Sequence, residues 1–229
     1  MKILLTTSLF AGLATMLILG VEKTGKLVDQ SKVTYHLTEE KKLDGAFLIE
    51  DAANVTRLRG TYKGDKRSGD WYCFDATGKL VLRYNYTASK LLSVDQNSIA
   101  GLDIKVIDKD QTVATNARIP VPICSVDQFK KLLEAELKDQ IPAKERAGKA
   151  KVSADFLAMV NAKGEAKYVA TYAINGIEYK ANLSFNDKVF NMEWLPAEYE
   201  GKTYKSEVRF SSTFEIDPNT FNRRFIWNY

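Results

Sequence analysis

Apolar and polar side chains alternate in several runs of this chain, a pattern that predicts β-strands there. The clearest run covers residues 204–216, where Tyr, Val, Phe and Ile alternate with charged and hydroxyl side chains. Two further alternating runs, residues 151–160 and 166–174, are joined by a short polar sequence that contains Gly164. A glycine between two such runs is typical of a tight turn, so we expect an antiparallel hairpin.

One segment has the period of an amphipathic helix instead. Its apolar residues recur three and four positions apart, at Val126, Phe129, Leu133 and Leu137. Ser125 is predicted to be the N-cap, with Gln128 three residues later as in a capping box, and Pro142 ends the helix. A second helix is expected within residues 178–192, where apolar residues are frequent but have no sharp period, and a strand packed on the hairpin is the alternative.

A segment near the N-terminal third occurs twice, with an offset of 24 positions. The matching residues are Gly45 and Gly69, Asp51 and Asp75, Ala52 and Ala76, Leu58-Arg59 and Leu82-Arg83, and Tyr62 and Tyr86. Each copy contains two short aromatic or β-branched runs separated by turn residues, which predicts a hairpin in each copy.

Residues 60–80, GTYKGDKRSGDWYCFDATGKL, resemble the MORN-type repeat of bacterial envelope proteins and YwqK antitoxin-like proteins. The resemblance covers residues 44–91, and the first copy lacks the aromatic pair that the second has as Trp71 and Tyr72. It implies a β-meander that serves as a protein- or surface-binding scaffold. The alternative is a small sheet that only covers the next domain.

The segments on either side of the repeats are less regular. Residues 22–43 are polar, with one brief strand-like piece at 33–37, and are expected to be a lead-in. Residues 91–123 contain short apolar runs that predict edge strands or an extended connector. Pro120 and Pro122 lack the N–H that a central strand needs, so we place a domain boundary near residue 120.

The order of elements over residues 124–217 resembles the C-terminal domain of TonB-type energy transducers. That order is a helix, an Ile141-Pro142 segment closed by Gly148, a hairpin, a second helix, a tryptophan-proline element and a long final strand. The resemblance implies a small antiparallel sheet with one or two helices that binds a protein in the cell envelope. The chain has five prolines in total, so the long proline-rich linker of a working transducer is missing from it.

These patterns together predict an α+β fold, in which an N-terminal β-meander of MORN-like hairpins precedes a small TonB C-terminal-like domain. The expected segments are a signal peptide or anchor at 1–21, a polar lead-in at 22–43, a MORN-like β domain with its connector at 44–119, a TonB C-terminal-like domain at 120–217 and an aromatic, basic tail at 218–229.

The N-terminus carries the features of an export signal. Lys2 is followed by an uncharged, mainly apolar run that ends before Glu22. A single early lysine and several small residues favour a cleaved signal peptide, and hence a periplasmic or secreted protein. Because residues 3–21 approach the roughly 20 residues that span a bilayer, membrane association through an uncleaved inner-membrane anchor is the alternative.

Composition narrows the classes of function. An apolar fraction of 45% provides enough material for a folded core. The net charge of +4 comes from 33 basic and 29 acidic residues that are interspersed, so the sequence lacks the concentrated basic face of a nucleic-acid-binding protein. Cys73 and Cys124 lie among apolar residues, which favours free buried thiols over a disulfide.

The sequence contains few residues that could carry catalysis. His36 is the single histidine, and neither an HExxH motif nor a phosphate-binding glycine loop occurs, so we expect no enzyme, no metal and no cofactor. A hydrolase that uses Cys73 or His36 is the least favoured class. Two acidic pairs next to lysines are expected on the exposed surface: Glu39 with Glu40 and Glu134 with Glu136.

The leading hypothesis is a non-enzymatic module that binds a protein partner in the envelope, for which an outer-membrane protein is one candidate. The final strand is the candidate edge to which an extended partner segment would add, with the residues Tyr204, Ser206, Val208, Phe210, Ser212 and Phe214. The alternative is a secreted structural or surface-recognition protein led by the MORN-like repeats. The tail at 218–229 is expected to fold back over the sheet rather than to form an interface.

Overall fold

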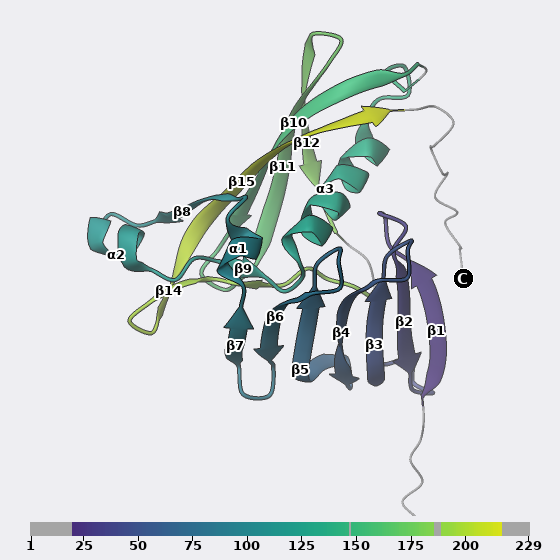
Figure 1. Cartoon of the computed structure of the whole chain (residues 1–229), viewed down its shortest axis with the longest axis vertical. Coiled ribbons are helices and arrows are strands. Elements are labelled where there is room, and N and C mark those ends of the chain that lie inside the picture. The colour runs from purple at the N-terminus through teal and green to yellow at the C-terminus, as the bar shows by residue number, and fades with distance from the viewer. Residues whose placement is uncertain (1–19, 147, 186–188, 217–229) are drawn as a thin grey trace, which may run out of the picture.

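The computed structural model describes residues 20–146, 148–185 and 189–216, which form two large antiparallel sheets and a small two-stranded one. The helix α3 (Val126–Gln140) lies at the junction of the two large sheets (Figure 1). The fold is mainly β, with few helices. None of the helices in the described ranges is long and apolar enough to cross a membrane. The expected signal or anchor, except for its last two residues, and the whole of the tail lie outside the described residues.

The first sheet is a meander in which each strand pairs with the next along the chain. Its strands are β1 (Val21–Lys26), β2 (Lys32–Leu37), β3 (Gly45–Glu50), β4 (Thr56–Lys63), β5 (Lys66–Phe74), β6 (Leu80–Asn85) and β7 (Lys90–Val94). The hairpins expected over residues 44–91 are confirmed. The strand-like piece expected at 33–37 is confirmed as part of β2, but the expectation that the rest of residues 22–43 is only a lead-in was wrong, because residues 22–26 belong to β1. β1 is mostly exposed, so its sequence lacks the apolar alternation of a strand with one buried face.

The sequence repeat corresponds to a repeated turn. Asp51 and Asp75 each accept hydrogen bonds through Oδ1 from the backbone N–H groups two and four residues later, at 2.9–3.0 Å. Each turn also contains one residue with positive φ, Asn54 at +60° and Gly78 at +81°. The matching aspartates therefore close equivalent loops, as expected for residues that compete with the backbone for local hydrogen bonds.

The face of the first sheet that is turned toward α3 carries an aromatic cluster. The completely buried ring of Trp71 lies 5.5 Å from the ring of Phe47, 5.2 Å from Tyr62 and 5.6 Å from Tyr86. A Cβ atom at Gly60 would lie 2.2 Å from the indole, so only glycine fits beneath this ring.

The connector between the sheets contributes to both halves of the molecule. It contains α1 (Gln96–Ile99), β8 (Asp103–Ile107), α2 (Gln111–Asn116) and β9 (Val121–Pro122). The apolar run around β8 forms an edge strand, as expected, whereas α2 occupies residues that were expected to be extended. Since β8 pairs with the last strand of the chain, the second sheet begins before the boundary expected near residue 120.

The second sheet has the order β12-β11-β10-β15-β14, with β8 also paired to β15. The strands are β10 (Ala150–Val160), β11 (Ala166–Ile174), β12 (Ile177–Leu183), β14 (Ala197–Tyr199) and β15 (Lys202–Ile216), and a short β13 (Trp194–Leu195) pairs with β9. The hairpin and the long final strand are confirmed. The helix expected within residues 178–192 was wrong, because Ala181 and Leu183 are buried with the period of two of the strand β12.

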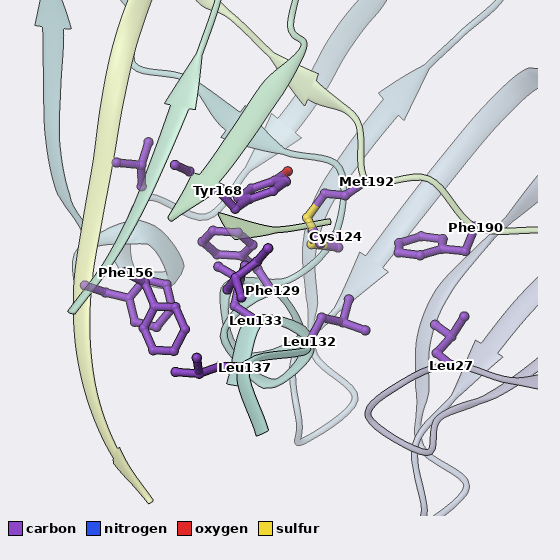
Figure 2. Packing of buried hydrophobic residues seen from close by; sticks show 14 of the residues in the cluster. Leu27, Cys124, Phe129, Leu132, Leu133, Leu137, Phe156, Tyr168, Phe190 and Met192 are labelled. Atoms are coloured by element: carbon purple, nitrogen blue, oxygen red, sulfur yellow. Dashed lines mark hydrogen bonds between the residues drawn. The ribbon is translucent and has the colours of Figure 1, made fainter. Parts of the chain in front are cut away.

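The helix α3 joins the cores of the two sheets. Figure 2 shows its apolar side chains between Phe156 of β10 and Leu27 of the β1–β2 turn. The ring of Phe129 lies 5.6 Å from Phe210 and 5.2 Å from Trp194. The buried residues of both sheets therefore form one continuous hydrophobic cluster. Glu136, expected on the exposed surface, is buried in this helix.

Two buried arginines of the first sheet also bind the C-terminal half. Arg57, 1% exposed, donates hydrogen bonds to Ser125 Oγ at 3.1 Å and to the Asp127 carboxylate. Arg67 lies 4.5 Å over the ring of Trp71, and its Nε is 3.3 Å from a Glu193 carboxylate oxygen. Ser125 is the N-cap residue of α3, but its side chain makes no capping bond, because its hydroxyl accepts from Arg57 instead; the expected capping box was wrong.

Candidate partner-binding strand

The strand β15 has the alternation that its sequence predicts, with one face against α3 and the other in solvent. Four of the six candidate side chains are buried and two are half-buried: Ser206, Val208, Phe210 and Phe214, and then Tyr204 and Ser212. These side chains form the core face of the strand. A partner strand would instead meet the backbone edge of β15 and its solvent-facing side chains.

The first half of β15 is not an edge. On one side, β10 pairs with residues 206–216. On the other side, β14 pairs with residues 202–204 and β8 with residues 205–209. The expectation of a free edge was therefore wrong for Ser206 and Val208, since the connector supplies a strand, β8, that the sequence did not assign to this position. Tyr204 pairs with Ala197 of β14.

Residues 210–216, which we call the open half of β15, pair only with β10. Among the residues that the structure describes, no strand lies along their other side. The open half, FSSTFEI, contains one charged residue, Glu215, and neither lysine nor proline. Natural edge strands are usually protected by charges or proline against pairing with other chains. The open half has little of this protection.

Two other outer strands of the described sheets are better protected. β1 has Glu22, Lys23 and Lys26 among its six residues, and β12 has Glu178 and Lys180. Lysines and alternating charges on an edge oppose the addition of a further strand. Strand addition is therefore less opposed at the open half of β15 than at β1 or β12.

The helix α3 holds the core face of the open half in place. Lys130 Nζ lies 5.2 Å from the centre of the Phe210 ring, and Lys138 Nζ lies 4.8 Å from that of Phe214. Between them, the Ser212 hydroxyl donates a hydrogen bond to Glu134. An edge that is already extended and supported loses little conformational entropy when a partner binds.

The two cysteines lie in the core as free thiols, as expected. Cys73 is completely buried, and burial raises the pKa of its thiol to about 12. The Cys124 thiol lies 3.6 Å from the sulfur of Met192, and burial raises its pKa as well (Figure 2). A thiol with so high a pKa is not ionised near neutral pH, so neither cysteine is activated as a nucleophile.

The single histidine is separated from both cysteines. His36 Nδ1 lies 3.0 Å from the carbonyl oxygen of Ala46, and Nε2 lies 3.8 Å from a carboxylate oxygen of Glu22. Tyr35, the neighbour of His36 on β2, packs against the core, so the alternation of the strand turns His36 to the opposite face from Cys73. The fold therefore does not assemble a Cys–His pair. Within the described ranges, no three metal-ligating side chains come together.

A half-open hollow of about 740 Å³ adjoins the turn between β10 and β11. Its lining includes the apolar side chains of Met159 and Leu183 and the charged side chains of Lys163 and Lys167. Burial raises the pKa of Tyr168, whose hydroxyl accepts a hydrogen bond from the indole of Trp194 at 2.8 Å. The tyrosine is occupied in a structural bond, and the acidic lining residues Glu165 and Glu193 accept hydrogen bonds from Asn161 and Tyr86.

The comparisons with known proteins found no relative of this chain. No protein-family model, no curated protein and no solved structure matches it. Its function is therefore argued from its own residues and their geometry.

Proposed function

We propose that this chain is a non-enzymatic protein-binding module of the bacterial cell envelope, which binds an extended segment of a partner as an added strand along the open half of β15. The observation that carries the proposal is the unprotected edge at residues 210–216, held extended by β10 and α3. Main-chain hydrogen bonds would provide the affinity, and the solvent-facing side chains Ser211 and Thr213 would contact the partner.

The order of elements supports this proposal. The succession of α3, β10, β11 and β15, with β10 between β11 and β15, is compatible with the resemblance to the C-terminal domain of TonB-type transducers. In this chain, β12 takes the place of the second helix, and β8 covers the first half of the final strand. Energy transduction is not part of the proposal, because the sequence lacks a proline-rich linker.

The proposed localisation follows from residues 1–21, whose sequence has the features of a signal peptide or an anchor. A cleaved signal would release the module into the periplasm or the medium, where an outer-membrane protein is a candidate partner. An uncleaved segment would hold it at the inner membrane. Sequencing of the N-terminus of the mature protein separates the two cases, since only cleavage removes Met1 together with the apolar run.

Proline substitution tests strand addition. Successive residues of a strand direct their N–H groups to opposite sides. Of the two variants Ser212→Pro and Thr213→Pro, one therefore removes an N–H group from the open edge and leaves the pairing with β10 intact. The variant that keeps the thermal transition of the wild type is used to recover partners from envelope extract. Proline at Val208 is unsuitable, because this buried residue pairs with both β10 and β8.

The proposal predicts that the folded proline variant loses a partner that the wild type recovers. Lys23→Pro, on the outer strand β1 of the first sheet, is the matched control and should recover the same partner. Equal recovery by the folded open-half variant, or no specific partner for the wild type, would contradict strand addition at β15.

A second candidate function is surface recognition led by the MORN-like repeats in a secreted protein. It is favoured by the face of the seven-stranded sheet that points away from α3, which presents arginine and aromatic side chains to solvent. Deleting residues 44–91 cannot test it, because the two sheets share one core. Point substitutions on that face are required.

A further inference from the structure

A row of side chains crosses the first sheet on the face that points away from α3, which we call the outer face. Cross-strand pairing places Leu48 of β3 beside Arg59 of β4, Arg59 beside Tyr72 of β5, and Tyr72 beside Arg83 of β6. Leu58 and Cys73, the chain neighbours of Arg59 and Tyr72, are completely buried. The alternation of the strands therefore directs this row into solvent.

The row contains two arginines that the sequence repeat relates by its offset of 24 residues, Arg59 and Arg83. Arg83 has an internal partner, since its guanidinium donates hydrogen bonds to Asp70 on the neighbouring strand, one of them at 3.2 Å. This bond, with a further one from Asn85, lowers the pKa of Asp70 below its usual value. The charge of Arg83 is thus neutralised by a carboxylate of its own repeat unit.

The first repeat unit lacks that carboxylate. The residue that corresponds to Asp70 is Ala46, and the pairing of β3 with β4 places it relative to Arg59 as Asp70 is placed relative to Arg83. Arg59 and Ala46 are both exposed. Among the described residues, Arg59 has no carboxylate partner; its guanidinium lies over the rings of Tyr72 at 4.7 Å and Phe74 at 5.5 Å.

The contacts with the two rings hold the Arg59 guanidinium in place without using its N–H groups as hydrogen-bond donors to a carboxylate, so these groups can bind a ligand. A carboxylate is the natural ligand, because it accepts two parallel hydrogen bonds from one guanidinium. The space for this carboxylate lies above Ala46, because the first repeat unit has the arginine of the second unit but has alanine in place of the aspartate.

The surroundings favour an acidic protein side chain over other anions. Arg83 is neutralised by Asp70, and Lys32 on the same face lies 3.6 Å from Glu50, so two cations of this face already have carboxylate partners, whereas a nucleic acid or an anionic membrane requires a row of unpaired cations. Guanidinium groups lie over the Tyr72 ring, which reduces the free aromatic surface for a sugar. Leu48 and Phe74 provide apolar contacts beside the cation.

We propose that Arg59 is the centre of a second protein-binding site, which binds an Asp or Glu side chain of a partner above Ala46. This position relative to Arg59 is equivalent to the position of Asp70 relative to Arg83. Arginine and tyrosine are the residues that most often dominate binding energy at protein interfaces. The site is on a different sheet from β15 and does not depend on strand addition there.

The geometry of the site is testable without a partner. Ala46→Asp should supply the missing carboxylate, and its new carboxyl group should titrate below the ordinary value of about 3.9 by NMR, as Asp70 does. In the double variant Ala46→Asp with Arg59→Gln, the pKa should return to the ordinary value. A new carboxyl group with an ordinary pKa in both variants would show that Arg59 does not interact with a carboxylate at this position, and would overturn the proposal.

Binding is tested with a displayed library of random peptides, selected on the full wild-type protein and counter-selected on Arg59→Gln. Selected peptides should contain Asp or Glu beside an apolar residue, and their dissociation constants should rise about tenfold or more with Arg59→Gln and with Ala46→Asp. Arg209→Gln removes an equal charge from the second sheet and should leave binding unchanged.

Selected peptides without an acidic residue, or with equal affinity for Arg59→Gln, would overturn the proposal. Vesicles of phosphatidylglycerol and soluble polygalacturonate serve as probes for a membrane and for an acidic glycan. If either binds in an Arg59-dependent manner more tightly than the peptides do, the site recognises that class of anion and the proposed protein ligand is wrong.

Discussion

The guanidinium of Arg57 on β4 is paired with the carboxylate of Asp127 in the first turn of α3. The arginine is 1% exposed and also binds Asp51 and Ser125, so one side chain connects the first sheet to the beginning of the helix. Together with the continuous hydrophobic cluster, this network makes the two sheets a single folding unit.

Removal of this connection should be costly. We expect Arg57→Ala to lower the free energy of unfolding by about 3 kcal/mol, because it leaves a cavity and two carboxylates without their partner. Urea titration followed by tryptophan fluorescence measures the change, and the wild type should show one transition, since Trp71 and Trp194 lie in the same core. Arg209→Ala, which removes an exposed ion pair with Glu207, should cost less than about 1 kcal/mol. Equal losses for the two variants would contradict the structural role of Arg57.

The same network predicts a pH dependence. Burial alone would raise the pKa of Asp51, but hydrogen bonds from the Val55 and Ala53 N–H groups and from Arg57 lower it on balance. A lowered folded-state pKa stabilises the protein above the unfolded-state value of about 3.9, and this contribution disappears as the pH falls through the folded-state value.

Asp51→Asn keeps a turn-forming side chain and removes the charge. At neutral pH the variant should be less stable than the wild type by about 1 kcal/mol, and the difference should shrink once the pH falls below about 4. Urea titrations at a series of pH values measure it. A difference that is constant down to the acid range would mean that the Asp51 carboxylate does not contribute through its charge.

Local patterns in the sequence were sufficient for several elements. The spacing of Phe129, Leu133 and Leu137 predicted α3, and the alternation around Phe156 and Val208 predicted β10 and β15. The repeat predicted equivalent hairpins, because each hairpin is closed by bonds within its own few residues.

Long-range partners explain what the sequence could not predict. The Ser125 hydroxyl caps no helix because Arg57, far away in the sequence, binds it. The free edge at Ser206 and Val208 was predicted wrongly because their pairing with β8 depends on the tertiary fold and not on either segment alone. The site at Arg59 had a signal that was overlooked: Arg59 and Arg83 match in the repeat, whereas Ala46 and Asp70 do not.

Glycine at the turn between β10 and β11 is predicted to be indispensable. Gly164 has φ of +81°, and a Cβ atom there would lie 2.2 Å from the carbonyl oxygen of Trp194. Gly176 is the matched control, with φ of +80° and open space around its Cβ position. Gly176→Ala should cost about 1 kcal/mol through backbone strain, and Gly164→Ala about 2 kcal/mol more through the additional clash. Equal shifts of the urea midpoint would contradict the close approach to Trp194.

Both thiols should be unreactive in the native protein. Cys73 and Cys124 are buried with raised pKa values, so a disulfide reagent at about pH 8 should label neither of them within minutes, and both after denaturation in guanidinium chloride. Mass spectrometry of the labelled protein counts the reacted thiols. Rapid native labelling, or a denatured protein without free thiols, would contradict the free, buried state of the two cysteines.

The central claim is that a partner adds a strand along the open half of β15, and site-specific photo-crosslinking in living cells tests it most directly. A photoreactive amino acid is placed at Thr213, which is exposed in the open half, or at Thr203, which is exposed where β14 already covers the edge. Strand addition at the open half should give a discrete crosslinked protein from position 213 that is absent from position 203. No adduct at position 213, or the same adduct from both positions, would contradict it.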